Sequence, residues 1–518
     1  MSTRPVREPA GMSHQVADLL RSCVECGFCL PHCATFLATG NEALSPRGRL
    51  LLLGECLADP ALAADRDVLR ALDLCLGCRA CETACPSGVP YSLLEEGRKL
   101  AAERGGAAPL PPGAARLDRR SALRWLRRSG GLTRTVLRAL LGDRWRQRLD
   151  ARPVVGRPAR LLGTLPSSPR RDGDLLTLLD RMVAGDQVSP APVVPASAPA
   201  EPDAPAGVPV RTAIPATAPA RTATPAAVEM DPGSPAARSG PRRLRVVFFR
   251  GCASDALLGG TAMRLRSLLE AAGCEVVVPP GQDCCGALAE HAHDARRAQQ
   301  LRSRNQPVLK RALAGADVVV AEAAGCSLEL KDLGEGVGER VEDAIELLAR
   351  LRLPALAAVP LTVALHDPCH ARHGQGLLEA PRALLRRIPG LRLVTPHEAD
   401  VCCGSGGPYS LRHPDLAAAM GRRKAAHLAA TGARLVVTSN PGCLGQIADG
   451  LALVSPCLPV LPLTDLLWYA WRRAEGGGRR GWRAACGGQP AAGPDPPAEQ
   501  ALVRAGRSAS GPGDPRCS

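Results

Sequence analysis

Aromatic residues are scarce in this chain of 518 residues, of which only 2% are Phe, Tyr or Trp. Proteins that hold single-stranded nucleic acid stack its bases on aromatic side chains, so this composition argues against such a partner. Lysine is scarce as well, and arginine carries nearly all of the formal net charge of +15. An arginine bias alongside abundant Ala, Gly and Pro is weak support for phosphate binding. We therefore expect no nucleic-acid partner.

Long apolar runs are missing too. A membrane-spanning helix needs about 18 apolar residues, whereas the best candidate, 353–365, is short and contains Pro354 and Pro360. The first twenty residues hold no continuous apolar stretch of the signal-peptide kind. We therefore expect a cytoplasmic protein with reduced thiols. The segment 116–148, rich in Arg and Leu, leaves open a peripheral contact with the anionic inner face of the cell membrane.

Motifs for a two-electron cofactor are a third absence. Residues 334–338 come nearest to the dinucleotide motif G-x-G-x-x-G, but Glu339 stands at the sixth position. The sequence contains neither a P-loop nor a Ser/His/Asp arrangement. We therefore expect no catalytic side chain in this chain, and we expect any flavin to lie on another subunit.

Cysteine, in contrast, is abundant, with 21 residues. Disulfide scaffolds are usually short and secreted, so in this long chain we expect most cysteines to be metal ligands. The segments 23–33 and 75–85 share the spacing C-x2-C-x2-C-x3-C. The second continues into Pro86, as the bacterial ferredoxin pattern requires, whereas Cys33 is followed by Ala34.

This spacing predicts two [4Fe-4S] clusters, because the fourth cysteine of each run binds the other run's cluster in two-cluster ferredoxins. Zinc also accepts four cysteines, but zinc sites seldom use two interlocked runs. Between the runs, Ser45 and Pro46 mark a helix start, which favours an α-helical ferredoxin variant. The predicted ligands are Cys23, Cys26, Cys29 and Cys85 for cluster 1, and Cys75, Cys78, Cys81 and Cys33 for cluster 2.

The second half of the chain contains an internal repeat with the pattern Cys…Cys-Cys-Gly…Cys. Each cysteine of the first copy recurs 117 or 118 positions later. The β-branched runs 244–249, 274–278 and 317–320 alternate with helical patterns at 263–272 and 295–314, which predicts α/β modules with parallel sheets. Cysteines that follow such strands converge at one edge of the sheet. The candidate ligands are Cys252, Cys284, Cys285 and Cys326 in module 1, and Cys369, Cys402, Cys403 and Cys443 in module 2.

Three interpretations of the module cysteines remain open: a further iron–sulfur site, a zinc or empty site, or a redox-active disulfide between the two adjacent cysteines.

Composition divides the chain into seven segments. They are an N-terminal tail (1–15), the ferredoxin domain (16–110), a basic helical connector (111–181), a Pro/Ala-rich linker (182–241), module 1 (242–352), module 2 (353–474) and a C-terminal tail (475–518).

The motifs CVECGFC, SPRGRL and CLGCRACETACPSGVPY, followed by two Cys-Cys-Gly modules, resemble the iron–sulfur subunits of glycolate oxidase. More broadly they resemble the ferredoxin-plus-CCG subunits of 2-hydroxyacid and glycerol-3-phosphate dehydrogenases and of heterodisulfide reductases. The resemblance covers residues 16–110 and 242–474. Heterodisulfide reductase modules end in Cys-x-x-Cys, whereas Cys326 and Cys443 have no cysteine three positions later.

The resemblance implies an electron-transfer subunit of an FAD-dependent glycolate dehydrogenase. A partner flavoprotein would oxidise glycolate to glyoxylate, and this chain would relay the electrons to a quinone or another acceptor. The family leaves two alternatives open. The electron source could be lactate or glycerol 3-phosphate, or a module could carry out heterodisulfide-type catalysis. A metal-binding or redox-sensing module without catalysis is a third.

Overall fold

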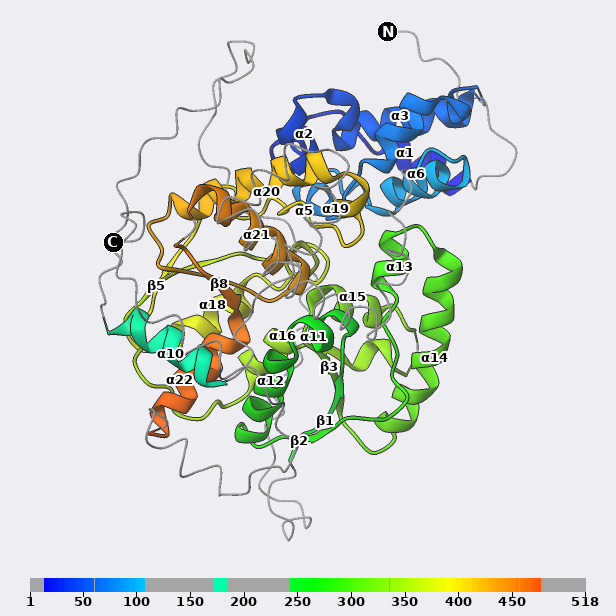
Figure 1. Ribbon diagram of the computed structural model, residues 1–518. Helices are drawn as coiled ribbons and strands as arrows, with labels where there is room; N and C mark the ends of the chain where they lie inside the picture. Colours follow the sequence, from blue (N-terminus) through cyan, green and yellow to red (C-terminus); the bar gives the residue numbers. More distant parts are fainter. Residues whose placement is uncertain are drawn as a thin grey trace, which may run out of the picture.

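The computed structural model describes residues 14–59, 61–107, 172–184, 243–334, 336–455 and 457–476. A helical domain comes first, and two α/β modules with parallel sheets follow it (Figure 1). The predicted connector, linker and tails lie almost entirely outside these residues. One helix, α10 (Asp172–Val183), is described there, and it crosses the predicted boundary at residue 181.

Within residues 14–59 and 61–107, the N-terminal domain contains helices and no strand. The helix predicted after Ser45 begins at Pro46, and the Gly48 backbone N–H donates to the Ser45 hydroxyl over 3.0 Å, as an N-cap requires. The helices are α1 (His14–Arg21), α2 (Ala34–Thr39), α3 (Pro46–Ala58), α4 (Arg66–Asp73), α5 (Ala80–Ala84) and α6 (Ser92–Glu103), with 3-10 turns at Leu30–His32, Glu42–Leu44 and Leu62–Ala64.

Module 1 has a four-stranded parallel sheet in the order β2-β1-β3-β4. The three predicted strands are present as the first three strands of this sheet. Its elements are β1 (Arg245–Phe249), α11 (Cys252–Leu257), α12 (Gly259–Ala271), β2 (Glu275–Val277), α13 (Ala287–His291), α14 (Ala295–Leu313), β3 (Val318–Ala321), α15 (Ala324–Lys331), β4 (Val341–Asp343) and α16 (Ala344–Arg350), with a 3-10 turn at Gly338–Arg340.

Module 2 repeats this topology with the order β6-β5-β7-β8, also parallel. The internal repeat of the sequence is therefore a repeat of structure. Its elements are β5 (Thr362–Leu365), α17 (Cys369–Arg372), α18 (Glu379–Arg386), β6 (Arg392–Val394), α19 (Tyr409–Arg412), α20 (Pro414–Ala429), β7 (Leu435–Thr438), α21 (Pro441–Val454), β8 (Val460–Pro462) and α22 (Leu463–Ala474).

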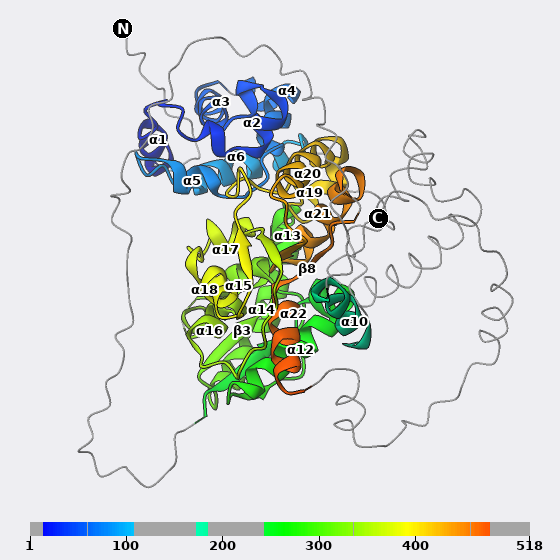
Figure 2. The ribbon, with the colours of Figure 1, turned by 90° about the vertical axis from the view of Figure 1, so that its left-hand side faces the viewer.

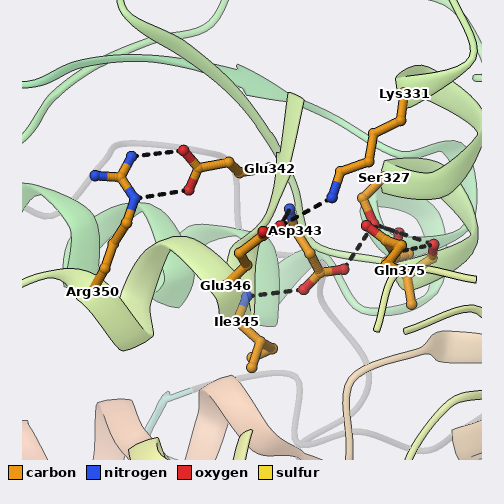
Figure 3. A network of polar contacts seen from close by, with 10 residues as sticks. Ser327, Lys331, Glu342, Asp343, Ile345, Glu346, Arg350 and Gln375 are labelled. Atoms are coloured by element: carbon orange, nitrogen blue, oxygen red, sulfur yellow. Dashed lines mark hydrogen bonds and ion pairs between the residues drawn. The ribbon is translucent and has the colours of Figure 1, made fainter. Parts of the chain in front are cut away.

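The two modules share one hydrophobic core, which contains residues from both sheets, from α12 and from α22. Within it, the buried Arg264 guanidinium pairs with the Asp465 carboxylate at 2.7 Å. A second junction lies at α15, where the Gln375 amide of module 2 donates to the Ser327 hydroxyl over 3.0 Å. Ser327 in turn donates to Asp343, the residue that caps α16 (Figure 3). The modules therefore form one packed body.

The N-terminal domain lies against one end of this body, next to α13, α19 and α20 (Figures 1 and 2). The buried Asp73 carboxylate faces His293 of module 1 and His413 of module 2, at 3.6 and 3.0 Å. The Tyr409 hydroxyl donates to the Leu74 carbonyl over 3.2 Å. These contacts hold the C-terminal end of α4 (Asp73) and the following residue, Leu74, against both modules.

Candidate metal centres

The four cysteines predicted for cluster 1 line a single pocket, which Cys81 and Arg47 also border. The four predicted ligands in this pocket are Cys23, Cys26, Cys29 and Cys85. Cys26 is exposed, so this pocket opens on the protein surface. Burial raises the pKa of the Cys29 thiol, which means that a cation is needed to hold this sulfur as a thiolate at neutral pH.

The two cysteine loops share one backbone conformation. In the first loop Glu25 and Gly27 have φ values of 53° and 81°, and in the second Gly77 and Arg79 have 70° and 63°. These are the second and fourth positions after the leading cysteine in each run. Left-handed conformations at Glu25 and Arg79 are costly for residues with a side chain. Their recurrence at matching positions indicates that both loops are shaped to turn successive sulfurs toward one centre.

The cysteines predicted for cluster 2 lie deeper. Cys33 and Cys75 are buried, and Cys78 and Cys81 are half-buried. Burial, followed by the neighbouring thiols Cys78, Cys75 and Cys33, raises the pKa of Cys81 well above its ordinary value. The mutual influence of the four sulfurs shows that the fold brings this set together.

Two buried arginines accompany the second set. Arg49, which is 2% exposed, donates to the Ala71 carbonyl and lowers the pKa of the neighbouring Cys33 thiol against the effect of burial. Arg98 donates to the Tyr91 hydroxyl over 2.9 Å, and the nearby Cys75 favours its charged form. Buried cations offset the negative charge of thiolates, so this environment suits the anionic ligand shell of an iron–sulfur cluster.

Module 1 brings its four candidate cysteines together at the carboxyl ends of its strands. The Cys252 and Cys284 sulfurs are 3.3 Å apart, and those of Cys285 and Cys326 are 3.4 Å apart. Hydrogen bonds from Cys252 and Cys285 lower the pKa of the Cys284 thiol to about 4. All four are free thiols. The arrangement offers a group of sulfur donors in the crevice where parallel α/β sheets bind ligands.

Module 2 places its cysteines in the same way, with 4.0 Å between the Cys369 and Cys402 sulfurs. The Asn440 amide donates to the Cys443 sulfur over 3.5 Å. Lys424, which is 2% exposed, lies beside Cys402 and Cys403 and donates to the Glu398 carbonyl. Burial lowers the pKa of Lys424, and the nearby Cys403 and Cys402 sulfurs act against this effect.

The second cysteine loop of the N-terminal domain contacts the module 2 cysteines directly. A hydrogen bond with Cys402 and burial raise the pKa of Cys78 well above its ordinary value. Cys78 and Cys369 pack in one cluster with Leu76 and Tyr409. Two groups of candidate ligands from different domains are therefore neighbours in space, although more than 300 positions separate Cys78 from Cys402 in the sequence.

Comparisons with known proteins agree with this architecture. The model of the 4Fe-4S dicluster domain matches residues 19–89, and the model of the cysteine-rich CCG domain matches residues 246–331 and 363–448. A protein of Bacillus subtilis (strain 168) described as a probable glycolate oxidase iron-sulfur subunit is 30% identical over 471 residues, which are 87% of this chain and 94% of that protein.

The chain belongs to the family of glycolate oxidase iron–sulfur subunits.

Further relatives lie inside and outside this family of glycolate oxidase subunits. The glycolate oxidase iron-sulfur subunit of Escherichia coli (strain K12) is 29% identical over 83% of this chain and 90% of its own length. Lactate utilization protein A of Oceanobacillus iheyensis is 26% identical over 43% of this chain and 96% of its own length. These comparisons confirm three predictions: the family, the order of an iron–sulfur domain followed by two CCG modules, and the oxidoreductase class. The assignment of individual cysteines to clusters stays a prediction.

For the membrane, the structure adds one finding. None of the helices within the described ranges combines the length and the apolar character that a membrane-spanning helix requires.

Some site residues of this glycolate oxidase family member could not be found by spacing. Arg98 and Lys424 are single charges among 65 basic residues, and nothing in the sequence marks them as buried beside sulfur. Arg49 lies in the motif SPRGRL, which contributed to the resemblance but suggested only a helix start. His366 begins the segment His366-Asp-Pro-Cys-His370, which resembles the glycolate oxidase subunits, so the resemblance and not the spacing drew attention to it.

Proposed function

We propose that this chain is the electron-transfer subunit of an FAD-dependent glycolate dehydrogenase. In this account a partner flavoprotein removes two electrons and two protons from glycolate, which becomes glyoxylate, and the chain accepts the electrons one at a time. The names of the relatives support a complex with glycolate as substrate. The acceptor is a quinone or another carrier, and both the cytoplasmic location and a peripheral membrane contact stay predictions.

The N-terminal cysteines are proposed to hold two [4Fe-4S] clusters, with the interlocked ligand sets derived from their spacing. Such clusters exchange single electrons when bound. Cys26 presents the first set at the surface, where a flavoprotein can approach it, whereas Cys78 connects the second set to module 2. The chain's own residues thus outline a route from the surface to the interior.

The observation that carries this proposal is the contact between Cys78 and Cys402. Electron transfer between sites requires that they be close, and this contact brings a predicted cluster ligand beside a candidate ligand of module 2. A metal-storage or zinc-sensing protein would not need the two sets to meet. A relay does.

Lactate is the second candidate substrate of the complex. Lactate utilization protein A of two further species aligns with this chain over 90% and 98% of its own length. Glycolate is preferred because the glycolate oxidase subunits align over more than four fifths of this chain, whereas the lactate utilization proteins align over about two fifths.

The test replaces Cys78 with serine in the complex purified anaerobically with its partner. We expect the loss of about four of the eight irons that the N-terminal cysteines would hold. Glycolate should still reduce the partner's flavin, but electrons should no longer reach an acceptor dye. Iron analysis, flavin absorbance and dye reduction measure the three effects.

Cys56→Ser is the matched control, because Cys56 is buried and belongs to none of the four candidate sets. It should keep its iron and its electron transfer. A Cys78→Ser complex whose flavin is no longer reduced by glycolate would contradict the proposed division of labour. Lactate as the better flavin reductant in the unmodified complex would favour the second candidate.

A further inference from the structure

The imidazole ring of His366 is buried in module 2. It follows β5, in the segment that leads to Cys369, and is 1% exposed. Its backbone N–H donates to Val437, but neither ring nitrogen has a partner among the residues that the structure describes. An unsatisfied buried polar group costs roughly 1–3 kcal/mol. Such a group calls for a ligand that pairs with it.

The ring lies beside two sulfurs of module 2. One nitrogen of His366 and the Sγ atoms of Cys403 and Cys443 all lie within 4.8 Å of one another, and all three residues are buried. In a tetrahedral site with metal–sulfur bonds of about 2.3 Å and metal–nitrogen bonds of about 2.0 Å, neighbouring donors are roughly 3.5–3.8 Å apart. A contraction of about 1 Å would therefore let all three bind one ion.

Cys402 offers a possible fourth donor atom, its sulfur. Cys402 interacts with Cys403 through its side chain, and its sulfur is 4.0 Å from that of Cys369. Zinc, iron and cobalt all accept imidazole together with thiolates. Lys424, which is 2% exposed, is a buried basic side chain beside Cys402 and Cys403.

Module 1 lacks this imidazole. The repeat offset of 117 positions places Phe249 at the site that corresponds to His366, and Phe249 is equally buried at 1% exposure. The module 1 sulfurs lie in close pairs at 3.3 and 3.4 Å. Two modules with the same fold and the same four cysteines therefore differ in one potential donor.

We propose that His366 is a metal ligand, and that module 2 holds its metal through one imidazole and the thiolates of Cys403 and Cys443, whereas module 1 offers thiolates alone. The proposal concerns the ligand set of module 2. It holds whether the complex uses glycolate, lactate or another electron source, so its failure is separable from that of the proposed function.

The experiment uses the full chain, purified anaerobically with its N-terminal iron retained, and adds Co²⁺ as a paramagnetic probe. Pulsed electron paramagnetic resonance then looks for coupling to a directly bound nitrogen, with ¹⁵N-histidine labelling to assign it. If an iron–sulfur cluster already fills module 2, the same coupling is sought in that cluster's reduced spectrum. We expect histidine nitrogen coupling in the unmodified protein.

In His366→Ala we expect that coupling to disappear and Co²⁺ affinity to fall by about 100-fold or more, since even the loss of an outer-shell partner costs 10–100-fold. His370→Ala is the matched control. His370 is a half-buried histidine of the same module, and its ring stacks on His291 with 4.9 Å between centroids. It should keep both the coupling and the affinity.

The variant His366→Cys distinguishes loss of a metal ligand from a general disturbance of the fold, because it replaces the imidazole with a thiolate that can also bind the metal. It should bind the metal without nitrogen coupling and with a stronger sulfur-to-cobalt charge-transfer band. Absence of histidine coupling from every metal spectrum of the unmodified protein would overturn the proposal. Coupling that survives in His366→Ala would overturn it as well.

Discussion

At the scale of single residues, the candidate centres are distinguished by the charges that surround them. Arg49 lies beside the second cysteine set and Lys424 beside the module 2 set. In module 1, hydrogen bonds between neighbouring thiols and burial are the largest influences on the pKa values of Cys252, Cys284 and Cys285. Buried cations favour the reduced, more negative state of a redox centre. The second set and module 2 are therefore expected to be easier to reduce than an equivalent site without them.

Arg49→Gln should lower the reduction potential of the cluster proposed at the second set. A unit charge about 6 Å away at an effective dielectric constant of about 20 contributes roughly 3 kcal/mol, which corresponds to a shift on the order of 100 mV. A redox titration followed by electron paramagnetic resonance measures it.

Arg49→Lys keeps the charge and should leave most of that potential in place. The hydrogen bonds of Arg49 to Ala71 and Thr35 are weakened in both variants. A potential that changes equally in the two would show that packing, rather than charge, sets it.

Sequence spacing predicted which cysteines would gather but not what would surround them. Cys23, Cys26, Cys29 and Cys85 meet at one pocket, although Cys85 is 56 positions from Cys29. The interlocked pattern anticipates this because it specifies a shared geometry. Arg98 and Lys424 could not be predicted, since a charged residue is ordinarily expected at the surface and its burial depends on which helices pack together.

At the scale of elements, α3 connects sequence to site most directly. It begins at the Ser45 cap and carries both Arg47, which borders the first pocket, and Arg49. The Ser45 hydroxyl also donates to the Glu42 carboxylate over 2.8 Å, and Ser45 is fully buried. The cap therefore holds the start of a helix that serves both cysteine sets.

Ser45→Ala should lower the free energy of unfolding of the N-terminal domain by about 1–2 kcal/mol, because an N-cap is lost. Thermal unfolding monitored by loss of the iron–sulfur colour measures the change. Ser45→Asp can accept the same backbone hydrogen bond and should recover part of the stability. An unchanged midpoint in Ser45→Ala would mean that the cap contributes nothing.

Strands and long helices were predicted closely because their patterns are local. The runs 244–249 and 317–320 became β1 and β3, and the helix expected at 295–314 spans Ala295–Leu313. The strand order within each sheet was not predicted. It depends on crossovers that only the packed core determines.

At the scale of the whole molecule, the central feature is the position of the N-terminal domain on the two modules. Asp73, Leu74 and Cys78, all near the second cysteine loop, meet residues of both modules. These are long-range contacts between segments with no shared pattern, so neither spacing nor composition could have revealed them. Because of these contacts, the second cysteine set of the N-terminal domain lies next to the cysteines of module 2.

The most direct test of this account is electron paramagnetic resonance of the anaerobic complex after glycolate is added. The account predicts that spectra of reduced [4Fe-4S] clusters arise on this chain as the partner's flavin turns over. Iron analysis of the same sample should give about eight irons per chain at the N-terminal cysteines. A flavin that is reduced while this chain gives no cluster spectrum, or zinc at those cysteines, would contradict it.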